Sequence, residues 1–300
     1  MTLIPLLLAL LVLVPAALWL RDVVERALLY KPGRPSPVTP ADCGREWEEV
    51  LLTAADGVRL HAWWFPQPRA RGTLLFCHGN TGTMADRLWL VEDLRDFPVN
   101  LLLLDYRGYG HSRGTPSLPG TDLDLEAAHA WIRARHGGQA DPPLVVWGRS
   151  LGGAIATRLA ARHPPRGLIL ECTFTSIEEM ARRFYPYMLA HRLSRNRYHT
   201  LDLVPALRCP LLLAHSEDDL RIPPDMGHRL FAAAPEPKEY VALRGSHSEA
   251  GWRTTPDYRA VFERFVLDCL DGRRKTPSIN ASSAAQAQES VKSVREPSSD

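Results

Sequence analysis

The chain has 300 residues, of which 45% are hydrophobic and 23% are charged, and this ordinary globular composition excludes a wholly disordered or fibrous protein. Its 36 Lys and Arg residues and 34 Asp and Glu residues leave a net charge of only +2, which gives no electrostatic reason to expect a nucleic-acid partner. The five cysteines are odd in number and include no CxxC pair, so a disulfide framework is not expected.

An apolar run without a charge stands near the N-terminus, from Leu3 to Leu20. As a helix it would be about 27 Å long, close to the hydrocarbon thickness of a bilayer at about 30 Å. We therefore expect residues 1–22 to be an uncleaved, single-pass membrane anchor; a cleaved signal peptide is the alternative. The positive-inside rule favours a cytoplasmic body, because basic residues flank the C-terminal side of the run: Arg21, Arg26, Lys31 and Arg34.

Proline-rich and polar segments bound the body of the chain. Residues 23–44 contain the sequence PGRPSPVTP (Pro32–Pro40), which indicates a semi-rigid linker because it can neither pair as a strand nor wind as a helix. Residues 273–300 are small and polar without an apolar period, and we expect a disordered tail there. Residues 45–272 are long enough to form one domain with a large core.

Short apolar runs alternate with amphipathic stretches along this domain. Two strand patterns first flank Asp56-Gly57, a hairpin signal. Apolar runs typical of strands buried on both faces then follow: TLLFCH, NLLLLDY, LVVWGRS, GLILEC and PLLLAHS, with KEYVAL after them. Helical patterns lie between them: Ala85–Arg95, Asp122–Arg135, Leu151–His163, Asp225–Ala234 and Thr255–Leu270. This alternation predicts a doubly wound α/β sheet with an antiparallel hairpin in front, and residues 173–205 interrupt it as an insertion of short helices.

The most informative segment is Gly148-Arg149-Ser150-Leu151-Gly152, which lies between an apolar strand and a helical pattern. A serine on a sharp strand-to-helix turn has crowded backbone angles, and the flanking glycines let the neighbouring chain pass closely. The turn raises the hydroxyl above the sheet, where N–H groups of the helix N-terminus face a developing oxyanion. The spacing predicts that Ser150 is a catalytic nucleophile; the alternative is a glycine-rich turn with an N-capping serine.

Candidates for the base and the acid follow Ser150 in the chain order that this kind of fold uses. His247 lies in a turn after the strand KEYVAL and is predicted to be the base. Asp219 follows the strand PLLLAHS and is preferred to Asp218 as the acid that orients the base. Glu171, at the end of the strand GLILE, is a rival acid.

A second part of the oxyanion hole is expected after the strand TLLFC, where the chain continues as His78-Gly79-Asn80-Thr81. We predict that the backbone N–H of Asn80, or that of Thr81, forms the hole together with the N–H of Leu151. His78 is predicted to support this loop rather than to act as a base.

Six motifs in order resemble one known family: HGNTGT at 78–83, DYRGYGHSRGTPS at 105–117, GRSLGG at 148–153, ECTFTS at 171–176, HSEDDLRIP at 215–223 and GSHSEAGW at 245–252. Together they resemble the membrane-anchored α/β-hydrolase-domain subfamily, which is similar to acyl-protein thioesterases, monoglyceride lipases and serine aminopeptidases. The resemblance covers about residues 45–270. It implies an α/β-hydrolase fold with a mostly parallel eight-stranded sheet, helices on both faces and a short helical cap over about residues 173–205.

The resemblance also implies roles for five residues. The triad positions are taken by Ser150, Asp219 and His247, and the oxyanion hole by the N–H groups of Asn80 and Leu151. One departure concerns the residues after HGN, where the bulkier Thr81 and Thr83 stand in place of the Ala and Asn that related sequences often have.

These residues predict a serine hydrolase that cleaves carboxylic ester or thioester bonds through an acyl-enzyme on Ser150, in small-molecule, lipid or acylated substrates. A serine peptidase similar to aminopeptidases and a non-catalytic membrane scaffold are the alternatives. The sequence contains no HExxH, CxxC pair, acidic metal cluster or GxGxxG, so we expect neither a metal nor another cofactor. The basic, aromatic stretch Met180–Tyr198 is interpreted as a lid over an apolar pocket rather than as a surface for RNA.

Overall fold

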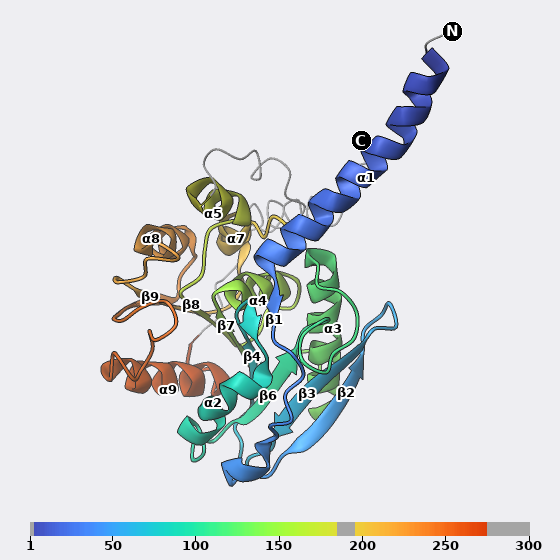
Figure 1. The fold of residues 1–300 in the computed structure, drawn as a ribbon. Helices are drawn as coiled ribbons and strands as arrows, with labels where there is room; N and C mark the ends of the chain where they lie inside the picture. Colours follow the sequence, from blue (N-terminus) through green and yellow to red (C-terminus); the bar gives the residue numbers. More distant parts are fainter. Residues whose placement is uncertain (1–2, 185–195, 275–300) are drawn as a thin grey trace.

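A sheet of eight strands forms the centre of the computed structural model, which describes residues 3–184 and 196–274 (Figure 1). The strand order is β10-β9-β8-β7-β4-β6-β3-β2. The pairs β2–β3 and β3–β6 are antiparallel, and the other pairs in this sheet are parallel. The strands are β2 Glu48–Thr53, β3 Arg59–Phe65, β4 Thr73–Cys77, β6 Asn100–Asp105, β7 Leu144–Arg149, β8 Gly167–Glu171, β9 Leu211–Ser216 and β10 Lys238–Leu243. The mostly parallel, eight-stranded sheet predicted from the sequence is confirmed.

The burial of each strand follows its sequence pattern. Every residue of β4, β8 and β9 is buried, as continuous apolar runs predict for strands covered on both faces. The edge strand β2 alternates instead, and only Val50 and Leu52 in it are buried. Gly57 in the β2–β3 turn has a φ of 82°, a left-handed conformation that glycine adopts without strain. The Asp56-Gly57 signal therefore gives the hairpin where it was expected.

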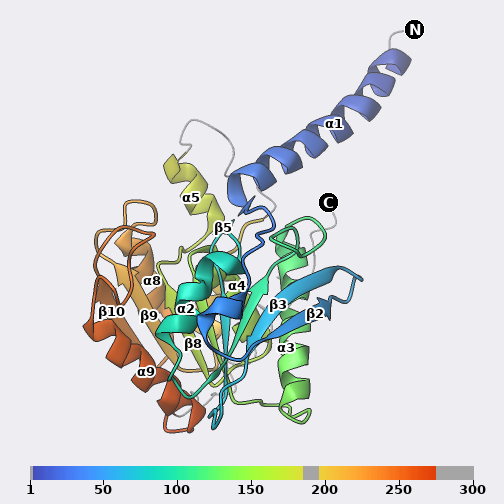
Figure 2. The same cartoon turned by 60° about the horizontal axis from the view of Figure 1, so that its bottom comes forward.

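Helices cover both faces of the sheet (Figures 1 and 2). On one face lie α3 (Leu118–Arg135), α4 (Leu151–Arg162) and α8 (Pro224–Ala233), and on the other lie α2 (Leu88–Asp93) and α9 (Asp257–Leu270). The sheet thus separates two hydrophobic cores, one under each layer of helices. This confirms the α/β-hydrolase architecture, in which the carboxyl ends of parallel strands meet at one edge.

Two helices begin away from their predicted starts because of local capping. Helix α3 begins at Leu118 rather than at Asp122, since the hydroxyl of Ser117 accepts the N–H of Gly120 at 3.1 Å and so satisfies a donor of the first turn. The helix predicted from residue 85 starts instead as the 3-10 turn η2 (Met84–Arg87), and the α-helical part follows as α2.

The cap follows β8 and is described in part. Helix α5 (Ile177–Phe184) opens it, and α7 (Thr200–Leu203) with the 3-10 turn η3 (Val204–Ala206) leads the chain back to β9. Residues 185–195 of the predicted cap and residues 275–300 of the predicted tail lie outside the described residues.

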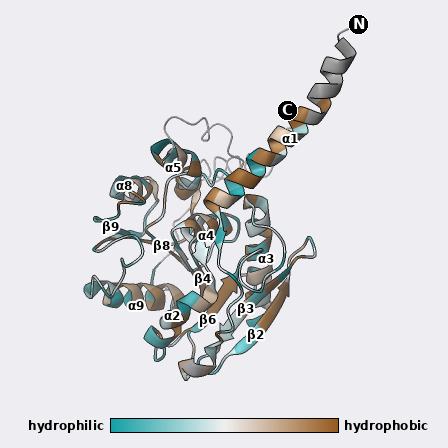
Figure 3. Cartoon of the chain, in the orientation of Figure 1, coloured by the Kyte–Doolittle hydropathy of each residue, from teal (hydrophilic) through white to brown (hydrophobic). Residues whose placement is uncertain are grey.

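Helix α1 (Leu3–Leu29) projects from the body at its N-terminal end and meets the body at its C-terminal end (Figures 1 and 3). Charged side chains interrupt its apolar sequence in the half nearest the body: Arg21, Asp22, Glu25 and Arg26. Within residues 3–184 and 196–274, no helix combines the length and the hydropathy that a membrane crossing requires. On this finding the predicted single-pass anchor, and the membrane localisation that followed from it, are wrong.

The start of the proline-rich segment is paired, which corrects the prediction that it cannot form a strand. Helix α1 continues beyond residue 22 to Leu29, and the short strand β1 (Lys31–Pro32) then pairs in parallel with β5 (Thr81–Gly82). Pro32 has no N–H, but the residues on either side of it donate theirs to carbonyls of the β5 loop, at 2.9 and 3.2 Å. After this contact the chain continues to the 3-10 turn η1 (Pro40–Cys43).

Candidate active site

Ser150 lies at the sharp turn between β7 and α4. Its φ is 55° and its ψ is −122°, a conformation that residues with a side chain rarely adopt. The glycine on each side is required by space. A Cβ on Gly148 would lie 2.3 Å from the carbonyl oxygen of Gly152, and a Cβ on Gly152 would lie 2.0 Å from the carbonyl oxygen of Cys77. The GxSxG spacing therefore lets β4, β7 and α4 meet tightly under the serine.

Gly152→Ala is expected to lower the free energy of unfolding by about 3 kcal/mol, because the added methyl group would press on backbone that belongs to the central strand β4. Equilibrium unfolding in urea measures this change. A variant as stable as the native chain would mean that the loop after β4 moves away from α4 without cost, which would contradict the tight fit described here.

Ser150, His247 and Asp219 form a hydrogen-bonded series at the carboxyl ends of three strands. The Nε2 of His247, in the loop after β10, lies 3.0 Å from the Oγ of Ser150. Its Nδ1 lies 2.6 Å from the Oδ2 of Asp219, in the loop after β9. Because the carboxylate accepts a hydrogen bond from the Nδ1–H group, Nε2 carries no proton and is left as the acceptor for the serine hydroxyl.

Backbone groups hold Asp219 in place as well. Its Oδ1 accepts the N–H groups of Arg221 and Ile222, both at 2.8 Å. Burial alone would raise the pKa of Asp219, but the hydrogen bonds from His247 and from these N–H groups bring it below its ordinary value. The group therefore stays ionised at neutral pH. The neighbouring Asp218 is exposed and accepts a backbone N–H of the opposite loop at 3.1 Å, so the acid beside His247 is Asp219.

The loop after β4 passes directly beside the serine. A Cβ built on Gly79 would lie 3.4 Å from the Cβ of Ser150. The Nδ1 of the buried His78 donates to the carbonyl of Gly79 at 2.7 Å, and a trans peptide points its C=O and N–H in opposite directions. This bond therefore turns the N–H of Asn80 away from His78. Leu151 carries the first N–H of α4, which has no acceptor within the helix.

His78 supports this loop from below. Burial lowers the pKa of His78 to about 3, so the imidazole is neutral at physiological pH. Its Nε2 lies 3.6 Å from the Oδ1 of Asp105, which accepts the N–H of Met84 at 2.7 Å, and its ring packs against Tyr106 with centroids 4.3 Å apart. None of these contacts is with Ser150, so the position of His78 agrees with a structural role.

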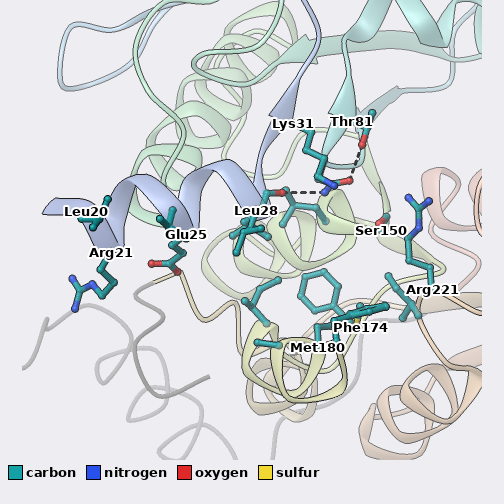
Figure 4. A pocket seen from close by; sticks show the side chains of 18 of the residues that line it. Leu20, Arg21, Glu25, Leu28, Lys31, Thr81, Ser150, Phe174, Met180 and Arg221 are labelled. Carbon is teal, nitrogen blue, oxygen red and sulfur yellow. Dashed lines mark hydrogen bonds between the residues drawn. The ribbon is translucent and has the colours of Figure 1, made fainter. Parts of the chain in front are cut away.

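A cavity of about 730 Å³ opens above Ser150 (Figure 4). The end of α1 forms one wall and α5 with the segment before it forms the opposite wall. Most of the lining side chains are apolar, namely Ala17, Leu20, Val24, Leu28, Leu29, Leu151, Phe174, Ile177, Met180, Ala181, Phe184 and Ile222. Charged groups also line it: Arg21, Glu25, Lys31 and Arg221.

Comparisons with known proteins assign the chain to a family. A family model described as serine aminopeptidase, S33, matches residues 68–201. The α/β hydrolase domain-containing protein WAV2 of Arabidopsis thaliana is 34% identical over 245 residues, which cover 74% of this chain and 79% of that protein. The chain belongs to the α/β-hydrolase family.

One further relative of this α/β hydrolase, and one solved structure with the same fold, have activities in their names. The lysophosphatidylserine lipase ABHD12 of Xenopus tropicalis is 34% identical over 248 residues, which cover 74% of this chain and 59% of that protein. The solved structure of the esterase Pf2001 of Pyrococcus furiosus has the same fold, with a TM-score of 0.66 at 18% identity over 81% of this chain and 100% of that one.

Glu171, the rival acid, lies away from the imidazole of this hydrolase. It is 1% exposed, and its carboxylate accepts the hydroxyl of Tyr258 at 2.5 Å and the guanidinium of Arg149 at 3.1 Å. Arg149 also donates to the backbone carbonyl of His247 at 2.9 Å. Glu171 therefore fixes the loop that carries His247 through Arg149, and it does not take the place of Asp219 beside the imidazole.

Sequence reasoning missed Arg149, although it is the residue before Ser150. The signal was its place inside the GxSxG motif, but its partner lies 98 residues further along the chain, and no pattern joins the two. In the part of the chain that the structure describes, no three His, Cys, Asp or Glu side chains are grouped so that they could hold a metal ion. All five cysteines are buried, and they form no disulfide with one another.

Proposed function

We propose that this chain is a serine hydrolase that cleaves carboxylic ester or thioester bonds through an acyl-enzyme on Ser150. The observation that carries the proposal is the series Ser150–His247–Asp219, with separations of 3.0 and 2.6 Å, on a strained turn that opens into a cavity. A nucleophile needs a base within hydrogen-bond reach, and the base needs a group that orients it. Both conditions are met here.

In the proposed reaction the Oγ of Ser150 attacks the acyl carbonyl carbon as the Nε2 of His247 takes its proton. Asp219 holds the imidazole tautomer and stabilises the imidazolium. The carbonyl oxygen becomes an oxyanion and accepts hydrogen bonds from the N–H groups of Asn80 and Leu151. The intermediate collapses to the acyl-enzyme, and the alcohol or thiol leaves with the proton from His247. Water then repeats the attack, releasing the acid and restoring the serine.

The cavity supports a substrate with an apolar acyl group. Its walls are mainly aliphatic and aromatic side chains, and its volume of about 730 Å³ lies in the range of small-molecule sites. A lipid ester is consistent with the activity named for the frog relative. The charged Lys31 and Arg221 lie at the same cavity and suit a polar or anionic leaving group.

The peptidase alternative follows from the description of the matching family model. An aminopeptidase needs an acidic group for the substrate amine, and among the described residues that line the cavity this group is the carboxylate of Glu25. Its Oε1 accepts the backbone N–H of Asn196 at 2.8 Å, so it already serves a structural contact. We therefore rank ester and thioester hydrolysis first.

A substrate panel on the purified full chain tests this order. It contains p-nitrophenyl esters of increasing acyl length, an acyl thioester and an amino-acyl p-nitroanilide. Each methylene buried in the cavity contributes about 0.8 kcal/mol, so kcat/KM is expected to rise by roughly fourfold per methylene until the cavity is filled. Faster cleavage of the anilide than of every ester would favour the peptidase, and a folded chain that turns over none of them would favour the scaffold.

A further inference from the structure

The loop that carries Asn80 is hydrogen-bonded to the end of helix α1 (Figure 4). The N–H of Lys31 donates to the carbonyl of Asn80 at 2.9 Å, and the Nδ2 of Asn80 donates to the carbonyl of Leu29 at 3.0 Å. The Leu29 carbonyl is among the last four of the helix, which have no donor within it. The hydroxyl of Thr81 donates to the Oδ1 of Asn80 at 3.1 Å, which orients the amide with its NH₂ group toward α1.

These bonds restrain both peptide units that flank the α-carbon of Asn80. The N–H of Asn80 belongs to the first unit, whose carbonyl on Gly79 is held by His78. The carbonyl of Asn80 belongs to the second unit, and it accepts from the N–H of Lys31 and from the hydroxyl of Tyr109 at 2.9 Å. Because each unit is planar, holding both of them limits φ and ψ at Asn80. The direction of its N–H therefore depends on contacts with the N-terminal segment.

The helix end that makes these contacts is itself fixed to the body. Tyr30 is 3% exposed, and its hydroxyl lies 2.9 Å from that of Tyr198 and 3.2 Å from the Oδ1 of Asn196. The hydroxyl of Tyr198 also bonds the hydroxyl of Thr121 at 2.8 Å. Glu25 accepts the N–H of Asn196. The last turns of α1 are thus tied to the start of α3 and to the segment that ends the cap.

The same helix end is a wall of the substrate cavity. Leu20 and Leu28 of α1 lie across the cavity from Phe174 and Met180, with Ser150 at one end (Figure 4). An acyl group in this cavity would contact the helix that restrains the oxyanion loop. The end of α1 therefore both lines the cavity and restrains the loop that carries Asn80.

We propose that Asn80 is a positioning residue whose side-chain amide, together with the N–H of Lys31, clamps the oxyanion-hole loop to α1. The N-terminal segment then belongs to the active site, because it holds the Asn80 N–H in the direction in which this group can donate to the oxyanion. This proposal rests on the serine-hydrolase function proposed above. Loss of one oxyanion donor costs about 10²- to 10³-fold in kcat, and a misplacement of about 1 Å can cost about 10²-fold. Loss of one clamp bond leaves the others in place, so its effect is smaller.

Asn80→Ala keeps the backbone N–H of residue 80 but removes the bond to Leu29. For p-nitrophenyl acetate, which is too short to reach far along the cavity wall, we expect kcat to fall about 10- to 100-fold with KM within about threefold of native. Asn100→Ala is the matched control. Asn100 also uses its side chain to bond a backbone group, the N–H of Gln67 at 3.0 Å, but it begins β6 at the opposite end of the sheet, and its loss should leave kcat native.

A second pair of variants removes the other half of the clamp without changing the loop. Lys31→Pro deletes the N–H that bonds the Asn80 carbonyl, whereas Lys31→Ala loses the same side chain but keeps the N–H. We expect a kcat at least about tenfold lower in the proline variant than in the alanine variant. Thermal unfolding is measured for all variants to separate folding from positioning.

Native kcat in a folded Asn80→Ala variant overturns the proposal, even where its melting temperature is lower, because the contact is then only structural. If Lys31→Pro does not fold, Asn80→Ala alone decides. A native chain that hydrolyses no ester or thioester would instead contradict the proposed function, so the two failures are distinguishable.

Discussion

Turnover of a p-nitrophenyl ester is expected to fall about 10⁶-fold in Ser150→Ala, the size of loss that removal of a triad nucleophile causes. Without the Oγ no acyl-enzyme can form, and His247 and Asp219 have no hydroxyl to activate. Catalysis left by the oxyanion hole and by binding alone would still exceed the reaction in water by about 10³- to 10⁴-fold. The measurement is kcat of the purified variant, with its fold checked by circular dichroism.

Ser248→Ala is the matched control for this change. Ser248 is exposed and follows His247 directly. Its side chain is not part of the series Ser150–His247–Asp219, so the variant should turn over the ester at the native rate. Turnover of Ser150→Ala within about tenfold of native would contradict the assignment of the nucleophile.

Asp219→Asn is expected to lower kcat about 10⁴-fold while the fold stays intact. In the native chain the Oδ2 of Asp219 accepts a hydrogen bond from the Nδ1–H of His247, with the two atoms 2.6 Å apart. The asparagine amide would place an N–H group at this position instead. The imidazole would then carry its proton on Nε2 and could not accept one from Ser150. The pKa of Asp219 lies below its ordinary value, so the native carboxylate remains ionised over the neutral range and the loss should be present throughout it.

Asp218→Asn provides the comparison, because the two carboxylates are neighbours in sequence but only one contacts the imidazole. Asp218 is exposed and bonds Arg244 and a backbone N–H, so turnover should change less than about threefold. Equal losses in the two variants would mean that the acidic loop acts through its net charge rather than through one hydrogen bond.

Local patterns were sufficient to predict the sheet and the proximity of Ser150, His247 and Asp219. The unbroken apolar runs of β4, β7 and β8 identify buried strands, and parallel strands bring their carboxyl ends to one edge. Ser150 follows β7 directly, and Asp219 and His247 lie in the loops that follow β9 and β10. Their proximity could therefore be expected from the order of strands and loops, without knowledge of side-chain contacts.

Contacts between distant segments could not be predicted in this way. The bond from Arg149 to the carbonyl of His247 and the pairing of Lys31 with the Asn80 loop depend on how loops fold over the sheet edge. The prolines of Pro32–Pro40 predict that the segment does not pair, but in β1 the hydrogen-bond donors are the two residues that flank Pro32. A composition rule that considers a segment alone cannot find such a contact.

The N-terminal helix shows the same limit. The count of apolar residues from Leu3 to Leu20 favoured an anchor, whereas the helix runs on to Leu29 through charged residues and joins the wall of the cavity. Hydropathy counts apolar side chains but does not show what they contact: Leu28 lines the cavity, whereas Leu11 and Leu13 are exposed.

The most direct test of an activated serine at residue 150 is covalent labelling of the full chain by a fluorophosphonate, followed by mass spectrometry of the peptides. An activated Ser150 should give one phosphonyl adduct, on the peptide that contains this residue, and Ser150→Ala should give none. An adduct on another serine would contradict the assignment of Ser150. The assignment would also be contradicted if the probe labels a known serine hydrolase in the same solution but does not label the folded native chain.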